Sequence, residues 1–150
     1  MKRPRKRWIL FTLAIALAAV FALPWIQQRW RAASLLSKYE TQTQVPAAPT
    51  QEVDYQSNRG SFHGRLYGDC QESTPLLLLH GVHAAGIDGH RLRNFANQLY
   101  ETGFSVLTPQ LDALQDFRFA PETIVQIHVA AQYLSERCHL ARIGVIGISF

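Results

Sequence analysis

Apolar strand-like runs and helix-periodic segments alternate along the C-terminal half of this sequence. Strands are predicted at Pro75–Leu79, Phe104–Thr108 and Ala141–Ile146, because short apolar runs bounded by Gly or Pro are typical of strands buried on both faces. Helices are predicted between them, one over Asp88–Glu101 and one that Pro121 begins. Strand, helix, strand, helix, strand is the pattern of a parallel sheet with helical crossovers. The body is therefore predicted to have an α/β fold.

Two further strands are predicted ahead of this pattern. Glu52–Ser57 and Ser61–Tyr67 flank a short turn, Asn-Arg-Gly at residues 58–60, and strands joined by such a turn pair antiparallel. They fit an antiparallel start to the same sheet. In open parallel sheets the functional loops follow the carboxyl ends of the strands. Residues 80–89 and 147–150 are therefore the loops to test for a site.

An uncharged stretch of 21 residues, Trp8–Gln28, lies near the N-terminus. As a helix it would extend about 31 Å, close to the thickness of the hydrocarbon core of a bilayer. We expect an uncleaved transmembrane anchor. A cleaved signal peptide and a buried core helix stay open as alternatives. The signal peptide is less favoured, because the small residues Ala14, Ala16 and Ala18 lie inside the apolar run, whereas a cleavage site follows it.

The charges beside this stretch predict its orientation. Residues 2–7 carry five positive charges and residues 29–38 carry three, so the positive-inside rule keeps the N-terminus in the cytoplasm. We expect a single-pass protein of the cytoplasmic (inner) membrane with an extracytoplasmic, periplasmic body. The expected organisation is a basic cytoplasmic tail at 1–7, a transmembrane signal-anchor helix at 8–28, a juxtamembrane segment and linker at 29–51, and the folded body at 52–150.

The net charge of +4 does not indicate a nucleic-acid-binding protein. Residues 1–40 hold eight basic side chains and one acidic side chain, whereas residues 41–150 hold seven basic and ten acidic ones. A body with a net charge of −3 offers no positive patch for nucleic-acid phosphates. We therefore expect no nucleic-acid partner.

Residues 81–86 have the glycine spacing of a phosphate-binding P-loop, but the residues that follow do not fit. Ile87 and Asp88 stand where a P-loop has Lys and then Ser or Thr, which bind phosphate and Mg²⁺. Three nearby histidines have a spacing that matches no zinc signature: His80, His83 and His90. The sequence predicts neither a cofactor nor a metal.

Ser149 follows a predicted buried strand in the sequence Gly147-Ile148-Ser149-Phe150. G-x-S is the beginning of the nucleophile elbow G-x-S-x-G, a tight strand-to-helix turn that presents the serine hydroxyl above the sheet. Gly147 would give the room that such a turn needs. A serine after a glycine is also a common turn residue, and this plainer interpretation stays open.

Acyl transfer at Ser149 would require two backbone N–H groups that stabilise the developing oxyanion. The residue after the nucleophile supplies one, here Phe150, and the loop after the third strand supplies the other. That loop begins His80-Gly81-Val82. His80 and Gly81 would shape the turn, and Val82 is the candidate for the second donor.

The order of these motifs resembles the α/β-hydrolase superfamily, and within it bacterial hydrolases distantly similar to dienelactone hydrolases. The resemblance covers residues 52–150, the N-terminal half of that fold. One departure is the loop after the fourth strand, which reads Thr108-Pro109-Gln110 where many relatives have an Asp. It implies that Ser149 is the nucleophile for a small-molecule ester or other acyl substrate, with Val82 and Phe150 as oxyanion donors. The segments that carry the resemblance are Leu76–Gly81 (LLLLHG), Gly103–Leu111 (GFSVLTPQL) and Ile143–Phe150 (IGVIGISF).

The resemblance leaves two catalytic partners unassigned. In this family the triad acid and histidine follow the nucleophile, so we expect both beyond Phe150 and interpret the chain as a fragment that ends just after its nucleophile. Without the base the fragment itself is expected to be inactive. A non-catalytic remnant or binding module that keeps the half-fold is the alternative. Four residues that precede the nucleophile are not candidates: Asp112, Asp116, His128 and His139.

The body contains two cysteines, Cys70 and Cys138. They precede the third and the fifth strand, which are neighbours in the fold that the resemblance implies. A disulfide between them is therefore expected, and an extracytoplasmic body would allow it. Two free thiols are the alternative.

Overall fold

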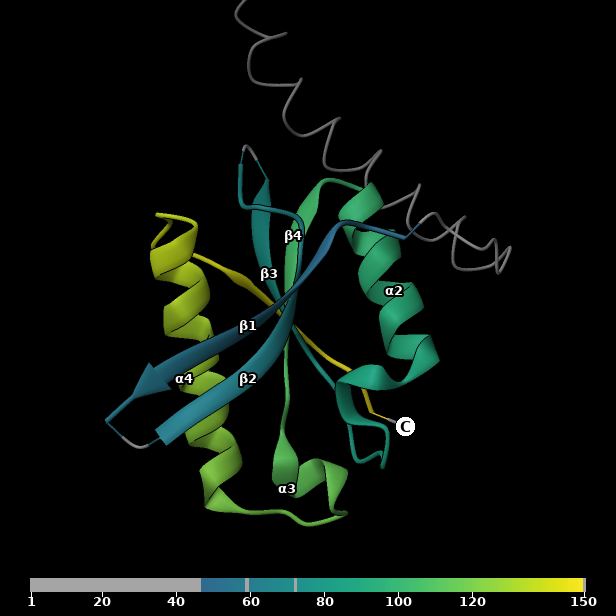
Figure 1. Ribbon diagram of the computed structural model, residues 1–150, viewed down its shortest axis with the longest axis vertical. Helices are drawn as coiled ribbons and strands as arrows, with labels where there is room; N and C mark the ends of the chain where they lie inside the picture. The colour runs from purple at the N-terminus through teal and green to yellow at the C-terminus, as the bar shows by residue number, and fades with distance from the viewer. Residues whose placement is uncertain (1–46, 59, 72, 150) are drawn as a thin grey trace, which may run out of the picture. The chain divides into compact units, whose positions relative to one another are not determined.

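The computed structural model describes residues 47–58, 60–71 and 73–149 (Figure 1). The chain divides into two compact units, Met1–Glu40 and Thr41–Phe150, and the described residues belong to the second. The predicted membrane span at 8–28 lies outside the described residues. Among the residues that are described, no helix is long and apolar enough to cross a membrane.

Five strands form one mixed sheet in the described part of the chain. Its order is β1-β2-β4-β3-β5. β1 pairs antiparallel with β2 and β2 with β4, whereas β3 pairs parallel with both β4 and β5. The predicted antiparallel start and parallel continuation are therefore confirmed. The strands are β1 (Thr50–Ser57), β2 (Gly60–Tyr67), β3 (Thr74–Leu79), β4 (Phe104–Pro109) and β5 (Gly144–Gly147).

The helices follow the predicted alternation with two differences. α4 (Pro121–Arg137) begins at Pro121 as predicted, because proline fits the first helical turn. α2 (His90–Glu101) begins two residues later than predicted, because residues Gly86–Asp88 form a separate 3₁₀ turn, η1, and the extended backbone of Gly89 interrupts the path between them. A short helix, α3 (Asp112–Gln115), lies where a loop was predicted, so Asp112 is helical.

The fifth strand begins later than its apolar pattern predicts. The prediction was Ala141–Ile146, but β5 starts at Gly144. The residues before it close the C-terminus of α4: His139 has a φ of 52°, and the Ser135 hydroxyl donates to the Leu140 carbonyl at 2.7 Å. Residues 141–143 connect this turn to the sheet, so the strand begins only at Gly144.

Side chains alternate between the two faces of the sheet, as the pleat requires. On one face, buried residues of the strands pack against α4. The residues next to them along β3 and β4 are also buried, and Figure 1 shows α2 on the side of the sheet opposite to α4. The core against α4 includes Leu66, Leu77, Leu107, Val129 and Leu134. Buried residues toward α2 include Leu76, Leu78, Val106, Ala96 and Leu99.

The order of the strands reverses at β3. β4 lies on one side of β3 and β5 lies on the other. Because both crossovers from parallel strand to parallel strand are expected to be right-handed, such a reversal places their helices on opposite faces, as Figure 1 shows for α2 and α4. In open α/β sheets, ligands bind beside the carboxyl ends of the strands at such a reversal. The fold therefore singles out the carboxyl end of β3.

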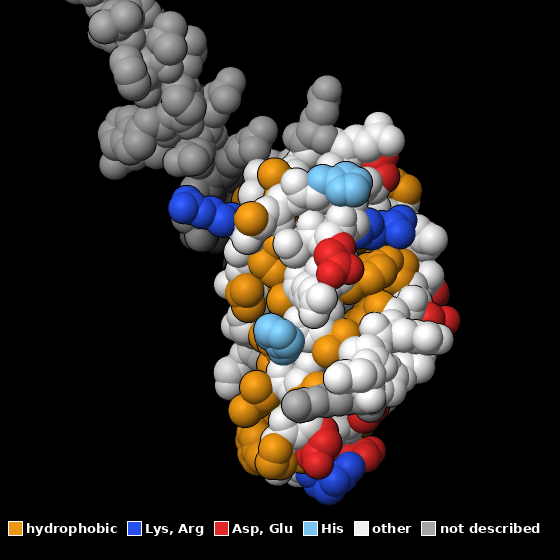
Figure 2. Space-filling view, turned by 90° about the vertical axis from the view of Figure 1, so that its left-hand side faces the viewer, with side chains coloured by type: hydrophobic (Ala, Val, Ile, Leu, Met, Phe, Trp, Pro, Cys, Tyr) orange, Lys and Arg blue, Asp and Glu red, His pale blue; other side chains and the backbone are white. Residues whose placement is uncertain are grey.

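Large hydrophobic side chains remain exposed in the segment between α3 and α4, on α4, in the turn after it and on β5. Figure 2, which faces the side of the molecule that carries α4, shows hydrophobic side chains gathered on this surface. Large exposed apolar patches usually mark a contact with another element or molecule. The exposed large hydrophobic residues are Phe117, Phe119, Ile124, Leu140 and Val145.

Candidate active site

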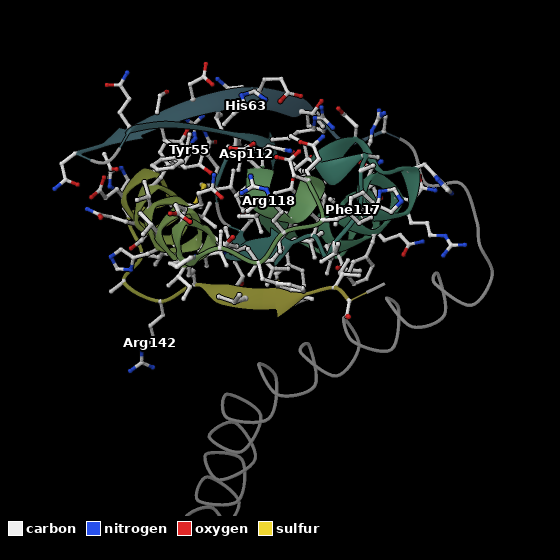
Figure 3. All side chains as sticks on the ribbon, turned by 90° about the horizontal axis from the view of Figure 1, so that it is seen from below. Tyr55, His63, Asp112, Phe117, Arg118 and Arg142 are labelled. Carbon is white, nitrogen blue, oxygen red and sulfur yellow. A yellow bond between two sulfur atoms is a disulfide. The ribbon has the colours of Figure 1, made fainter. Side chains whose placement is uncertain are left out.

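Ser149 leaves the sheet beside the loop that follows β3. Gly147 at the end of β5 pairs with Leu79 at the end of β3, and the Ile148 amide donates to the Leu79 carbonyl at 3.0 Å. The segments that follow β3 and β5 therefore lie side by side at the carboxyl edge of the sheet. Figure 3 looks at the molecule from this end, with β5 along one side, β1 and β2 along the other, and Asp112 between them. Ser149 is exposed.

His80 is buried and links the loops that follow β3 and β4. Its Nε2 accepts the Leu111 amide proton at 3.0 Å, so its Nδ1 carries the proton that is donated to the Gly81 carbonyl at 2.8 Å. Burial lowers the pKa of His80, although the Gly81 carbonyl and the charge of Asp112 oppose this shift. Both ring nitrogens are occupied, so His80 in this position supports the turn and is not available as a base.

Acidification should destabilise the fold through His80. Its pKa is lower in the folded state than in the unfolded state, so as the pH falls below about 6.5 the unfolded state takes up the proton first and the free energy of unfolding decreases. We expect the variant His80→Gln to be less stable at pH 7.5 and to lose less stability between pH 7.5 and pH 5. Urea unfolding at both pH values measures this. The same change at His128, which is exposed on α4, is the control. A pH dependence that is unaltered in His80→Gln would contradict the assignment.

Val82 presents a free backbone amide in the loop between β3 and α2, called here the 80–89 loop. Among the hydrogen bonds of the described residues, none uses the Val82 amide, and the residue is only half-buried. A free, fixed N–H group is what an oxyanion donor requires. Phe150, the other predicted donor, lies outside the described residues.

The surroundings of Gly147 do not show why a glycine is needed there. A Cβ atom at Gly147 would meet nothing within 4 Å among the described residues, and the residue is exposed. The crowding expected in a nucleophile elbow would have to come from the segment after Ser149. The role of Gly147 therefore stays a prediction.

Three polar side chains that sequence reasoning did not identify hold the 80–89 loop. Two of them, Gln110 and Gln115, follow β4, and the third is Arg65 of β2. The Gln110 Oε1 accepts the Ile87 amide proton at 3.2 Å, and the Gln115 Nε2 donates to the Ala84 carbonyl at 3.0 Å. The one signal in the sequence was a polar residue directly after a buried strand.

Arg65 fixes the far end of the same loop. Its Nη2 pairs with the Asp88 carboxylate at 2.9 Å, its Nη1 donates to the Ile87 carbonyl at 3.3 Å, and its Nε pairs with Glu52. Burial of the guanidinium opposes its charge, but the hydrogen bonds to Glu52 and Asp88 outweigh it, so the pKa of Arg65 is raised. The guanidinium stays charged and ties η1 to the sheet.

Gly86 has a left-handed backbone conformation and lies against the Gln110 amide. Its φ is +49°, and a Cβ atom there would lie 2.6 Å from the Gln110 Oε1. We expect Gly86→Ala to lower the free energy of unfolding by about 1–3 kcal/mol, because the left-handed backbone becomes strained and the amide is displaced from its hydrogen bonds. Urea denaturation measures the change.

Gly89 provides the matched control for that substitution. It lies in the same loop, has a φ of −54°, and a Cβ atom there would make ordinary contacts, the nearest at 3.5 Å. We expect Gly89→Ala to cost less than about 1 kcal/mol. Equal losses in the two variants would show that the loop does not need glycine specifically at residue 86.

The remaining histidines of this loop region do not converge on a metal site. His83 accepts the Ala85 amide proton at its Nδ1, at 3.1 Å, and His80 is occupied as described above. In the described part of the chain, no group of three or more His, Cys, Asp or Glu side chains is arranged to hold a metal ion.

Cys70 and Cys138 are joined by a disulfide, with their Cα atoms 5.0 Å apart. Cys70 lies ahead of β3, and Cys138 caps the end of α4. This bond lies toward the amino ends of β3 and β5. It is therefore at the end of the sheet opposite to Ser149 and takes no part in the candidate site.

Comparisons with known proteins identify similar folds among solved structures. No known protein family and no curated protein matches the sequence. The chain is similar to the esterase Pf2001 of Pyrococcus furiosus, with 18% identity and a TM-score of 0.52 over 67% of this chain and 42% of that one. It is also similar to a hyperthermophilic esterase of the archaeon Pyrobaculum calidifontis, with 18% identity and a TM-score of 0.50 over 97% of this chain and 47% of that one.

The chain thus spans less than half the length of each of these structures. Its narrower resemblance to dienelactone-hydrolase-like proteins stays a prediction. The mixed sheet, the two helical faces and the matched structures agree with one another. The described residues form part of an α/β-hydrolase fold.

Proposed function

We propose that this chain is the N-terminal half of a membrane-anchored serine hydrolase that cleaves an ester or another acyl bond of a small molecule. The observation that carries the proposal is the placement of Ser149 beside the 80–89 loop, at the reversal in strand order. A nucleophile and a free amide at the carboxyl edge of a sheet are the first two parts of an acyl-transfer site.

In the proposed reaction, the Ser149 hydroxyl attacks the acyl carbonyl and gives its proton to a histidine base. The Val82 and Phe150 amides donate to the oxyanion of the tetrahedral intermediate. The leaving group departs with the proton from the histidine, and water then hydrolyses the acyl-enzyme by the same steps. The histidine and its acid partner would lie in a longer chain, beyond residue 150.

Two features of the described residues support a sheet that continues. β5 is an edge strand in the described part of the chain, and its Val145 is 56% exposed. An edge strand with an exposed hydrophobic side chain is usually paired or covered. A further strand beside β5, with its helices, would cover this edge and the apolar surface near α4.

The disulfide supports the proposed location of the body. Disulfides persist in oxidising compartments such as the bacterial periplasm and are rare in the cytosol. The bond between Cys70 and Cys138 agrees with an anchor at 8–28 that leaves the body outside the cytoplasmic membrane. Protease added to intact spheroplasts should then digest the body, and complete protection would contradict this orientation.

Labelling with a fluorophosphonate tests the proposed activity. The full-length protein should react, and mass spectrometry of the digested product should place the phosphonyl group on Ser149. The chain of 150 residues should stay unlabelled, because it lacks the proposed base. A full-length protein that does not react would favour a non-catalytic binding module, and label on another residue would contradict Ser149 as the nucleophile.

A further inference from the structure

Two glutamine side chains form a bridge between the 80–89 loop and the segment after β4. The Ile87 amide donates to the Gln110 Oε1 at 3.2 Å. The Gln110 Nε2 donates to the Gln115 Oε1, and the Gln115 Nε2 donates to the Ala84 carbonyl at 3.0 Å. The bridge therefore begins and ends on the backbone of the same loop.

The two ends of this glutamine bridge determine the direction of its hydrogen bonds. A backbone N–H at Ile87 can only donate, and the carbonyl at Ala84 can only accept. Each side chain between them must accept on one side and donate on the other. A primary amide does both, whereas a carboxylate only accepts. Amide groups are therefore required at both positions, and an acid at either one leaves two acceptors facing each other.

The backbone around the glutamine bridge holds it in place. The Gln110 amide nitrogen of the main chain donates to the His63 carbonyl at 2.9 Å, which anchors residue 110 to β2. The Gln115 amide nitrogen of the main chain donates to the Leu111 carbonyl at 3.0 Å, within the turn of α3. Gly86 leaves the space that the Gln110 amide occupies. The bridge therefore connects the loop to two rigid elements.

The glutamine bridge lies close in sequence to the proposed oxyanion donor. Val82 stands two residues before Ala84, one of the two backbone attachment points of the bridge. On the other side of Val82, His80 is tied to Leu111, one residue after Gln110. Three residues of the segment after β4, Gln110, Leu111 and Gln115, thus fix both flanks of Val82 without contacting its amide.

We propose that Gln110 and Gln115 are positioning residues that hold the Val82 amide in place for oxyanion stabilisation. This inference rests on the proposed function. It goes beyond that function because it assigns the geometry of the site to two side chains that touch neither the nucleophile nor the substrate. Displacement of an oxyanion donor by about 1 Å lowers turnover by as much as about a hundredfold.

Amide-to-acid variants of the full-length protein test the proposal. Gln110→Glu and Gln115→Glu each remove one donor from the glutamine bridge, and Gln132→Glu is the matched control, because Gln132 lies exposed on α4 and donates to Glu136 at 2.9 Å. Near-UV circular dichroism and thermal melts establish that each variant is folded. Two readouts follow: hydrogen exchange of the 80–89 backbone, and kcat and KM for a chromogenic ester over a range of pH.

We expect hydrogen exchange of the 80–89 loop to accelerate in both bridge variants and to stay unchanged in Gln132→Glu. We expect kcat to fall by about ten- to a hundredfold, with KM nearly unchanged because the glutamine bridge does not contact substrate. The pH profile of the residual activity should keep its shape, because the proposed base is not altered. A loss of stability alone would not produce this separation of kcat from KM in the folded protein.

Two results would overturn the proposal. Unchanged exchange of the loop in both variants would show that the glutamine bridge does not fix it, whatever happens to the activity. Accelerated exchange with unaltered kcat would show that the position of the loop does not matter to turnover. Failure of the proposed function would appear separately, as a Ser149 that does not react with fluorophosphonate, while the exchange measurement would still decide whether the bridge holds the loop.

Discussion

Replacing Ser149 by Ala in the full-length protein is expected to lower kcat by about 10⁶-fold, since removal of the serine of a catalytic triad has an effect of this size in subtilisin. The loss would be large because, in the proposed reaction, the hydroxyl forms the covalent bond of the acyl-enzyme. Among the described residues, Ser149 is the serine that lies directly after a strand at the carboxyl edge of the parallel sheet. Steady-state kinetics with a chromogenic ester measures the change.

Ser61→Ala is the control for this substitution, because Ser61 is exposed on β2 and belongs to an antiparallel pair away from the 80–89 loop. It should leave kcat unchanged. KM for Ser149→Ala should change little if the residue acts only in the chemical step. A variant that retains more than about one hundredth of the activity would mean that another group is the nucleophile, since even one oxyanion donor is worth about 10²–10³.

Most of the fold could be predicted from the sequence, because it depends on patterns that are local. The run Pro75–Leu79 is apolar throughout, and it forms β3, an interior strand of the sheet that is buried on both faces. Pro121 begins α4 as expected. The strand order could be predicted only through the resemblance, since β5 pairs with β3 across more than sixty residues and no local pattern specifies such a partner.

Two element boundaries, the starts of α2 and β5, differ from those predicted, and local hydrophobic patterns do not determine either one. The helix predicted from Asp88 begins only at His90, because Asp88 ends the 3₁₀ turn η1, which contains the positive φ of Gly86, and the extended backbone of Gly89 follows it. The beginning of β5 is displaced by the closing turn of α4. In both places the deciding contact comes from elsewhere in the fold or from a turn geometry that hydrophobic periodicity does not show.

The candidate site, like the fold, could be predicted from the sequence only in part. Ser149, Val82 and His80 could be proposed from the sequence because each occupies a fixed place relative to a strand that the sequence shows. The positioning side chains Gln110 and Gln115 could not, because their partners are main-chain atoms of Ile87 and Ala84. Backbone hydrogen bonds of this kind leave no pattern in the residue types.

Removing the disulfide is expected to cause the largest loss of stability in the body. Cys70 and Cys138 are separated by 68 residues, and closing a loop of that length in the unfolded chain is worth about 4 kcal/mol in the chain-entropy treatment. The double variant Cys70→Ala/Cys138→Ala should therefore lose about 4 kcal/mol in the free energy of unfolding. Urea denaturation of the protein from residue 47 onward, without the proposed anchor, measures this under oxidising conditions.

Reduction provides the control, since it opens the same bond without changing the sequence. With dithiothreitol present, the unchanged protein should unfold at nearly the urea concentration that unfolds the double variant, and the variant itself should not respond to the reductant. Activity of the folded protein should persist in both, because the bond lies at the end of the sheet opposite to Ser149. If oxidised protein and double variant unfold together, the bond does not constrain the unfolded chain, and the support that it gives to an extracytoplasmic body is lost as well.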